Sequence, residues 1–443
     1  LQAEGKRFGK LHGLPFTIKE CLDYVGTPST LGVLARKNDR PPTNDLYVEA
    51  LQNQGGIVLG KTNVPQLMVF IECYNRVYGT TNNPHNPKFA PGGSSGGEGA
   101  IVGAKASPVG IGTDIGGSVR FPAAFCGACS IKPTMWRTFD QTRFGEKTFD
   151  GPIMPVTGII ANFAEDLALF LEIMNEAAAA RWETKPLQNY REIDVSKLRI
   201  GYFLTDGFFE PMPAIKRGVL ESVEKLKSLG AEIIEFQPPK FQLAEEIFYR
   251  IMTVNGGENF HKILDGEKPV QQLKNMMMLN SAPAWKRNAV SSLAKFFGQP
   301  NLVRLISYFG GRGDEFLQNW AKERENYQRE LEKAMSEAEI DAILSPVAAL
   351  PAFLQNTVDK IGLGGNYSLL YNVSGFPAGV ARVGEVQKDE AVARRNSLDL
   401  IERTAAKTEK MSAGLPLSVQ IAAKPWREDV VIALVEKLHQ QTN

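Results

Sequence analysis

The sequence predicts an α/β protein with a largely parallel sheet. Short apolar segments with the composition of buried strands alternate with segments of helical periodicity along most of the chain, and this alternation is typical of such a sheet. A hydrophobic share of 43% beside 22% charged residues is that of a folded globular protein. The length of 443 residues allows one large domain with insertions or two to three smaller domains.

The expected elements can be placed along the chain one after another. They are strand 14–19, helix 44–54, strand 57–59, helix 98–105, helix 162–180, strand 198–204, helix 214–229, strand 232–236, helix 318–337, strand 340–344 and strand 415–421. Gly55 and Gly230 follow two of the helices as stop signals, and Asn162 with Glu165 has the spacing of a capping box. Residues 389–411 are expected to form a charged, helical insertion.

The overall composition excludes several classes of function. The chain has 50 Lys and Arg residues against 49 Asp and Glu residues, whereas a protein that binds nucleic acid through its phosphates needs a basic excess. The four cysteines are too few for a disulfide scaffold, and Cys126-x-x-Cys129 lacks the further ligands of a zinc site, so we expect no metal. No apolar run reaches the roughly 18 residues of a transmembrane helix, although a signal or anchor could precede Leu1.

One segment departs from the neutral charge balance. The 46 residues from Lys268 to Gly313 contain no acidic residue, but they contain several Lys and Arg residues beside Met, Trp and Phe. Basic and aromatic residues at helical spacing are typical of a helix that lies in a membrane interface. A pair of helices that face the protein core would give a similar pattern, so both interpretations stay open here.

Glycine is concentrated in a second segment. Ten of the 41 glycines fall between Gly92 and Gly117. Glycine at this density indicates a backbone that is held in special conformations or lies close to another group. We therefore expect the functional site in this stretch.

Two short motifs suggest other chemistry but lack the structural context that it needs. Residues 55–62 match a phosphate-binding loop, which requires a strand before it and a helix after its lysine, but here a helix is expected to precede it and its middle reads as a strand. Residues 93–97 match the nucleophile elbow of hydrolases with Ser95 as nucleophile. Loop-forming residues precede that motif, and none of the four histidines stands in a recognisable catalytic setting.

Ser94 and Ser118 remain as the serines in glycine-rich surroundings. The simplest role for Ser94 is to cap helix 98–105. The amides around the paired glycines before Ser118 can form an anion-binding nest, which would give a serine there its own oxyanion hole. Without a histidine, the candidate base is Lys19 at the end of strand 14–19. A lysine is protonated in water because its pKa is about 10.4, but burial among neutral hydroxyls would favour the neutral base.

Longer segments resemble a known family. GLPFTIKE around Lys19, PGGSSGGEGA around Ser94 and GIGTDIGGSVRFPAAFCG around Ser118 resemble the amidase signature family, and GLPLSVQ at residues 414–420 extends the resemblance over essentially the whole chain. The resemblance implies one amidase domain, residues 1–443, with a mixed, largely parallel twisted sheet between helices. It also implies that residues 268–313 form a basic amphipathic, membrane-facing helical cap within this domain.

The resemblance also implies roles for individual residues. Ser118 would be the nucleophile, Ser94 a bridging serine in a cis peptide, and Lys19 the base, without any cofactor or metal. The residues implied in binding the substrate are Met68, Ser94, Thr113, Ile115, Gly116, Gly117, Ser118, Leu369 and Val373. Among these, the amides of residues 115–118 would form the oxyanion hole, and Leu369 and Val373 would line an acyl channel. Asp114 and Arg120 would brace the nucleophile loop.

Within the family, the segments are most similar to animal enzymes that hydrolyse fatty-acid amides. The implied activity is cleavage of N-acylethanolamines and primary fatty amides through an acyl-enzyme. Two alternatives stay open: an amidase for small soluble or aryl amides, and an inactive relative that only binds lipid. The resemblance further implies an intracellular protein at the cytoplasmic face of endomembranes, a homodimer, and an anchor upstream of Leu1. Loss of lipid-vesicle binding when Phe296, Phe297 and Ile306 are replaced by charged residues would favour the lipid substrate.

Overall fold

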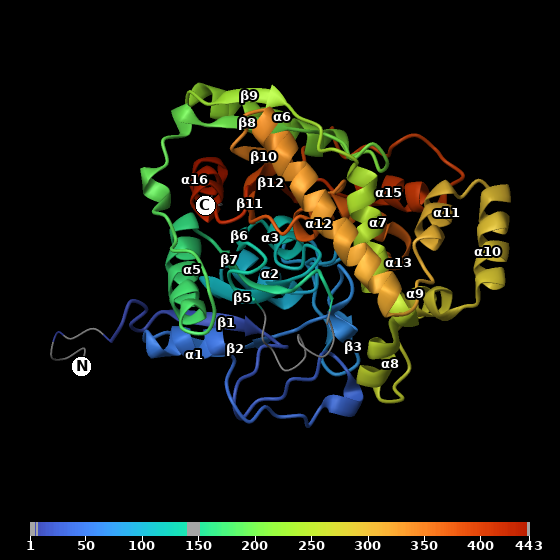
Figure 1. The fold of residues 1–443 in the computed structure, drawn as a ribbon, viewed down its shortest axis with the longest axis horizontal. Coiled ribbons are helices and arrows are strands. Elements are labelled where there is room, and N and C mark those ends of the chain that lie inside the picture. Colours follow the sequence, from blue (N-terminus) through green and yellow to red (C-terminus); the bar gives the residue numbers. More distant parts are fainter. Residues whose placement is uncertain (1–4, 6–7, 140–150, 441–443) are drawn as a thin grey trace.

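The structure, a computed structural model, describes residue 5, residues 8–139 and residues 151–440. Its centre is a ten-stranded sheet in the order β2-β1-β5-β7-β6-β11-β12-β10-β8-β9 (Figure 1). The strands are β1 (Pro15–Lys19), β2 (Ile57–Thr62), β5 (Val109–Asp114), β6 (Cys129–Lys132), β7 (Val156–Ala161), β8 (Arg199–Tyr202), β9 (Glu232–Glu235), β10 (Ala342–Pro346), β11 (Ala378–Glu385) and β12 (Pro416–Ala423). A small separate hairpin pairs β3 (Tyr74–Asn75) with β4 (Gly79–Thr80).

The sheet is mixed, as the family resemblance implies. Its parallel pairs are β1–β2 and β1–β5 at one end and β8–β10 and β8–β9 at the other. The strands between these ends, from β5 to β10, pair in antiparallel fashion. The alternation of strands and helices therefore predicted the parallel ends but not the antiparallel middle.

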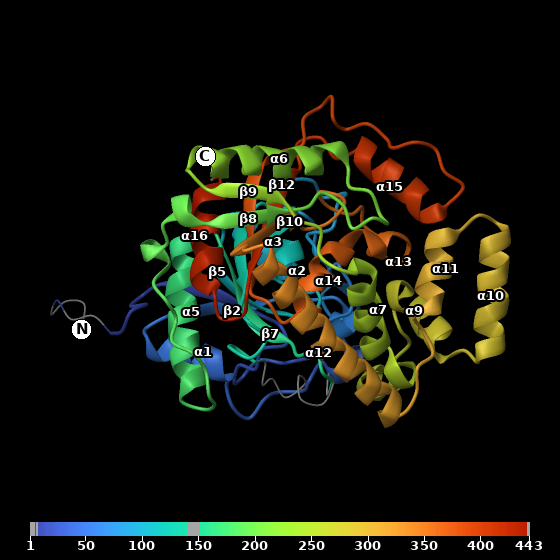
Figure 2. The same ribbon diagram turned by 45° about the horizontal axis from the view of Figure 1, so that its top comes forward.

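Helices cover the sheet. They are α1 (Leu46–Asn53), α2 (Gly96–Gly103), α3 (Arg120–Cys126), α5 (Ala164–Ala179), α6 (Pro213–Ser228), α7 (Phe241–Met252), α8 (Glu258–Leu264), α9 (Gln271–Ser281), α10 (Ala284–Phe296), α11 (Pro300–Ser307), α12 (Asp314–Glu337), α13 (Val358–Ile361), α14 (Leu369–Val373), α15 (Leu400–Lys410) and α16 (Glu428–Leu438). Helices α1, α5 and α16 form one layer, and α2 and α3 lie on the other side of the sheet (Figures 1 and 2). This confirms the predicted arrangement of a sheet between helices.

Two predicted helix starts have different outcomes. The side chain of Asp45 accepts hydrogen bonds from the first amides of α1, which confirms a start near Asn44. The capping box at Asn162 is wrong, because α5 begins at Ala164 and the Oδ1 atom of Asn162 accepts a hydrogen bond from Lys105 Nζ at 2.8 Å. The hydrogen bond from Lys105, which is distant in the sequence, thus takes the place of the predicted bond between Asn162 and the first amides of the helix. The predicted insertion 389–411 is helical only in its second half, where α15 lies.

Helix α2 can approach β5 closely because β5 carries glycines on the facing side. A Cβ atom at Gly110 would lie 2.1 Å from Glu98 Oε2, and one at Gly112 would lie 2.6 Å from Ser95 Oγ. Only glycine leaves room for these two buried side chains at such distances. The glycine density noted in the sequence thus brings residues 95–98 against the sheet.

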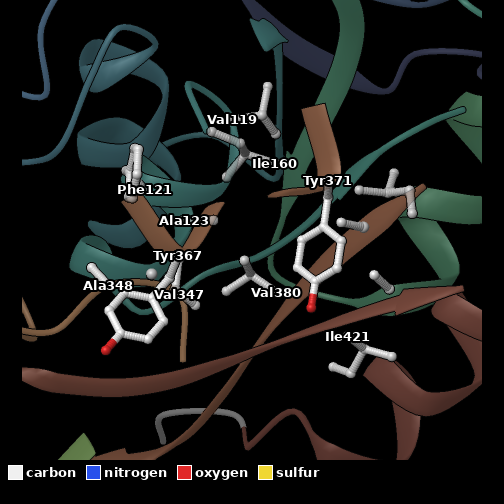
Figure 3. Packing of buried hydrophobic residues seen from close by; sticks show 14 of the residues in the cluster. Val119, Phe121, Ala123, Ile160, Val347, Ala348, Tyr367, Tyr371, Val380 and Ile421 are labelled. Atoms are coloured by element: carbon white, nitrogen blue, oxygen red, sulfur yellow. The ribbon is translucent and has the colours of Figure 1, made fainter. Parts of the chain in front are cut away.

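The core behind this region is continuous. Figure 3 shows Val119, Phe121 and Ala123, which follow Ser118, beside Val347, Tyr371 and residues of β11 and β12. All of these side chains are buried. Because protein cores are close-packed, the segment that contains Ser118 is held against a rigid support.

Helices α9, α10 and α11 lie at the edge of the molecule away from α1, α5 and α16 (Figures 1 and 2). They account for most of residues 268–313. Phe296 is 82% exposed, and Trp285, Leu293 and Phe297 are also exposed, whereas Ile306 is buried. A charged substitution at Ile306 would therefore not test the exposed surface, since this side chain is buried.

Candidate active site

Lys19 ends strand β1 in a fully buried position. Its Nζ atom donates hydrogen bonds to Ser94 Oγ at 2.8 Å, to Thr113 Oγ1 at 2.8 Å and to the carbonyl oxygen of Thr113 at 3.2 Å. These partners are neutral. Burial removes the water that stabilises the charged form of a lysine, and this is the kind of environment in which a lysine can act as a base.

Ser94 lies in the turn that leads into α2. The peptide bond between Gly93 and Ser94 is cis, as the family resemblance implies. A Cβ atom at Gly93 would lie 2.2 Å from the carbonyl oxygen of Phe70, so this position accepts only glycine. Ser94 does not cap α2, because the helix begins at Gly96 without a side-chain cap and the Ser94 hydroxyl instead meets Lys19.

Ser118 lies between the end of β5 and the start of α3. It is partly exposed, in contrast to Ser94 and Ser95, which are 3% and 0% exposed. The amide of Ser95 donates a hydrogen bond to the carbonyl oxygen of Ser118 at 3.1 Å, which ties the two serine-containing segments together. Of the three serines, Ser118 is thus the one that a substrate could reach.

A buried ion pair holds the Ser118 segment in place. The Asp114 carboxylate accepts hydrogen bonds from the amides of Gly117 and Val119 at 2.8 and 3.1 Å and from two nitrogens of Arg120 at 3.1 Å. Burial would raise the pKa of Asp114, but the Arg120 charge and these hydrogen bonds outweigh it and hold that pKa well below its usual range. Asp114 and Arg120 thus hold the loop around Ser118 in place, which agrees with the role that the resemblance implies for them.

An apolar cavity opens beside Ser118. It is lined by Met68, Phe70, Ile115, Gly116, Phe121, Phe248, Tyr249, Met252, Phe260, Met276, Met277 and Leu369, among others. Gly93 also lines it, so the turn before Ser94 faces the same space as Ser118. The cavity extends from the two serine-containing segments to α7 and to α9, so part of its wall belongs to residues 268–313.

Only part of the predicted substrate-binding set lines this cavity. The structure brings Met68, Ile115, Gly116, Ser118 and Leu369 together around it. Thr113 and Val373 are fully or almost fully buried elsewhere: Thr113 contacts Lys19, and the carbonyl oxygen of Val373 accepts a hydrogen bond from Arg324. Val373 lies one helical turn after Leu369 on α14, but it is fully buried and is not among the residues that line the cavity. The predicted acyl-channel role of Val373 therefore does not fit this structure.

The oxyanion hole predicted at residues 115–118 also needs a correction. The amide of Gly117 donates to Asp114 Oδ1, so this N–H is already engaged in bracing the loop. Ile115, Gly116 and Ser118 line the cavity, and within the residues that the structure describes their amides donate no hydrogen bond. An oxyanion formed at Ser118 would meet donors from this smaller set.

Other residues of the site could not be found from the sequence. Phe248, Tyr249 and Met252 come from α7, and Asn372 and Gln420 accept hydrogen bonds from Arg120. The amphipathic pattern of α7 signals burial but not which space its apolar face lines. Within the described ranges, no group of three or more His, Cys, Asp or Glu side chains is arranged to hold a metal ion.

The two alternative motifs have a structural role. Lys61 belongs to strand β2, and its Nζ atom donates to Pro28 O and Ser29 Oγ, so residues 55–62 are not a phosphate-binding loop. Ser95 is buried under Gly112, and its hydroxyl donates to the carbonyl oxygen of Thr113 at 3.3 Å.

Cys126 and Cys129 are buried free thiols, and burial raises the pKa of both.

Comparison with known proteins agrees with the family resemblance. A family model described as Amidase matches residues 1–432. Fatty-acid amide hydrolase 1 of Sus scrofa is 33% identical over 452 residues, which cover 99% of this chain and 77% of that protein. Fatty acid amide hydrolase 1 of Caenorhabditis elegans is 30% identical over 444 residues, with 97% and 76% covered. An acetamidase of Aspergillus oryzae is 29% identical over 453 residues, with 97% and 77% covered.

The fold is shared with a solved structure. A structure of fatty acid amide hydrolase superposes with a TM-score of 0.83 at 24% identity, and the match covers 99% of this chain and 75% of that one. At this identity the match supports the architecture of the sheet and helices.

Proposed function

The chain belongs to the amidase signature family and is a hydrolase that acts on amide C–N bonds, and from this premise we propose that it hydrolyses fatty-acid amides with Ser118 as nucleophile, Ser94 as proton relay and Lys19 as base. The observation that carries the proposal is the 2.8 Å hydrogen bond between Lys19 Nζ and Ser94 Oγ, next to a partly exposed Ser118 at an apolar cavity. A base joined to a relay serine, with a reachable serine beside them, supplies the elements of covalent catalysis.

Acylation follows from this arrangement. Ser118 Oγ attacks the carbonyl carbon of the amide, its proton passes to Ser94 Oγ, and the Ser94 proton passes to the neutral amine of Lys19. The carbonyl oxygen becomes an oxyanion, which backbone amides of the Ser118 loop stabilise. When the C–N bond breaks, the Lys19 ammonium returns a proton through Ser94 to the leaving amine. Water then cleaves the ester of Ser118 by the same route.

The cavity favours a long apolar acyl group as the substrate. Its wall of Met, Phe, Ile and Leu side chains offers contact with methylene groups, and each buried CH₂ group contributes about 0.8 kcal/mol. A small acyl group such as acetyl would leave most of this wall uncovered.

We further propose that the surface formed by residues 268–313 binds a membrane, from which a lipid amide would enter. Exposed Trp285, Leu293, Phe296 and Phe297 lie beside Lys286 and Lys295, and residues 398–400 add two exposed leucines next to them. The Gln299 side chain holds residues 398–400 next to this surface. It donates a hydrogen bond to Leu398 O and accepts one from Leu400 N, each at 2.8 Å. Such surfaces insert aromatic side chains among lipids and attract anionic headgroups. None of the helices in the described part of the chain combines the length and apolar character that crossing a bilayer requires.

Hydrolysis of small amides is the second candidate. It is supported by the similarity to acetamidases, of which the one from Aspergillus oryzae covers almost the whole chain. Comparing kcat/KM for a long-chain primary amide with that for acetamide distinguishes the two. The fatty-amide proposal expects a preference of at least a hundredfold for the long chain, and equal values would contradict it.

The triad is tested with a serine-directed fluorophosphonate. We expect labelling of the wild type, loss of labelling in Ser118→Ala, and labelling in Ser95→Ala. Labelling that persists in Ser118→Ala and disappears in Ser95→Ala would assign the nucleophile to Ser95. A wild type that is not labelled and hydrolyses no amide would be the inactive, lipid-binding relative.

A further inference from the structure

Glu98 is a buried carboxyl group that the mechanism above does not use. It lies in the first turn of α2 and is 0% exposed. Thr17 Oγ1 donates to its Oε2 atom at 2.5 Å, and Thr62 Oγ1 donates to its Oε1 atom at 2.6 Å. A buried carboxyl group is costly unless its oxygens are satisfied, so both threonines are needed to keep it there.

The two threonines place Glu98 next to Lys19. Thr17 lies two residues before Lys19 on β1, and side chains two apart share one face of a strand. Thr62 is the residue of β2 that pairs with Lys19 in the sheet. Gly110 on β5 completes the site, because any side chain there would overlap Glu98 Oε2. Three strands and one helix therefore hold this carboxyl on the face of the sheet that carries Lys19.

The other titratable groups around this pair can be named. They are Cys21, two residues after the end of β1, Cys73, directly before β3, and Asp114 at the end of β5. Burial raises the pKa of Cys73 to about 12, so it stays a neutral thiol, and Asp114 is engaged by Arg120. Lys61 on β2 points to Ser29. Glu20, which follows Lys19 in the chain, accepts hydrogen bonds from the amides of Thr30 and Leu31. Glu98 is the carboxyl group whose pKa the Lys19 charge lowers.

We propose that Glu98 is the acidic partner of Lys19, a positioning residue whose carboxylate stabilises the ammonium group that Lys19 becomes when it takes the proton from the serines. Its two oxygens are occupied by Thr17 and Thr62, while Lys19 keeps its hydrogen bonds to Ser94 and Thr113. The carboxylate therefore acts through its charge without pulling Lys19 away from Ser94. An opposite charge nearby favours the charged form of a base. This inference rests on the proposed function, since it assumes that Lys19 is the base.

The pKa of Glu98 sets the pH range in which this role applies. Burial raises the pKa of Glu98 to about 8, against the effect of the hydrogen bonds from Thr17 and Thr62 and of the Lys19 charge. Below that pH the carboxyl is neutral and gives Lys19 no support, and above it the carboxylate is present. Because the Lys19 charge lowers the pKa of Glu98, the two groups titrate as a coupled pair.

The test is the pH dependence of the rate at which a fluorophosphonate labels Ser118, measured in wild type, Glu98→Gln and Glu72→Gln. Gln keeps the shape of Glu98 and can still bond to both threonines, but it carries no charge. We expect the midpoint of the acid limb to move to lower pH by about one pH unit and the plateau rate to fall several-fold, because Lys19 becomes a weaker base. Glu72→Gln changes another buried carboxyl, which bonds to the amides of Thr357 and Val358, and should leave the midpoint in place.

The possible results separate the two proposals. A lower plateau with an unchanged midpoint would mean that Glu98 only supports the fold, and it would overturn the inference. No labelling of the wild type at any pH would instead contradict the proposed function. If Glu98→Gln does not fold, Thr62→Val decides. Thr62→Val removes one hydrogen bond to the Glu98 carboxylate and so disfavours its charged form. The midpoint of the acid limb should then move to lower pH, as in Glu98→Gln, whereas the midpoint in Thr62→Ser should match that of the wild type. An unchanged midpoint in Thr62→Val would then overturn the inference.

Discussion

The Nζ atom of Lys19 lies 2.8 Å from the Oγ atom of Ser94, although 75 residues separate the two in the chain. The contact joins the end of β1, the strand next to the edge of the sheet, to a turn that only glycine can form at Gly93. It also leaves Ser118 as the serine that faces the cavity. The predictions below follow from this geometry and from what surrounds it.

Replacing Lys19 by alanine should lower kcat/KM by about 10² to 10⁴, since general-base catalysis contributes that much. The loss should be greatest at low pH, because hydroxide can take the serine proton at high pH. A pH profile of fatty-amide hydrolysis measures this. Lys61→Ala is the matched control, since Lys61 is the penultimate residue of the neighbouring strand β2 but bonds to Ser29. Full activity of Lys19→Ala at neutral pH would refute its role as the base.

Leu369 and Val373 lie one turn apart on α14 but should behave differently. Leu369 lines the cavity, whereas Val373 is fully buried in the core. Leu369→Ala should change the ratio of kcat/KM values for long and short acyl chains. Val373→Ala should leave that ratio unchanged and lower the free energy of unfolding by about 1 to 3 kcal/mol. Steady-state kinetics and urea denaturation test the pair, and a change of chain-length preference in Val373→Ala would contradict the cavity described above.

Lys132 makes the stability of the protein depend on pH. Burial lowers its pKa in the folded protein to about 7, from an ordinary value of 10.5. Between these values the unfolded chain binds the additional proton, so the free energy of unfolding rises with pH by up to about 1.4 kcal/mol per pH unit. Lys132→Met should be more stable than the wild type at pH 7, and the difference should shrink toward pH 10. Denaturation curves at several pH values measure it, and a constant difference would contradict a proton-linked cost.

The exposed aromatic side chains of α10 should be required for membrane binding. Phe296→Ser combined with Phe297→Ser should weaken binding to anionic vesicles at least tenfold, because about 1.5 to 3 kcal/mol is lost for each large side chain that no longer inserts. Leu59→Ser is the control, since Leu59 is 54% exposed on β2. Vesicle sedimentation compares the variants. A charged residue at position 306 is unsuitable, because Ile306 is buried and the change would unfold α11. Equal binding of wild type and double variant would exclude this surface.

Much of the fold could be predicted because its elements have local signals. Helix α1 has its Asp45 cap, and strands such as β10 are short apolar runs. The capping box at Asn162 had an equally good local signal and was wrong. Lys105, two residues after the end of α2, donates a hydrogen bond to the Asn162 side chain, which therefore does not cap α5. Local patterns predict an element, but they do not exclude a competing partner from elsewhere in the chain.

The sequence by itself determined the family and the residues to examine, because Lys19, Ser94 and Ser118 lie in long segments that resemble the amidases. It also determined the glycines at 110 and 112, whose missing side chains leave room for α2. Only the tertiary structure decided that Ser95 is buried while Ser118 faces the cavity. It also decided that Val373 and Ile306 are buried. The hydrogen bond from the Gly117 amide to Asp114 likewise depends on the folded loop. The tertiary structure alone placed Glu98 beside Lys19. The physical reason is that burial and charge pairing depend on which distant segments the sheet brings together, and no local pattern encodes that.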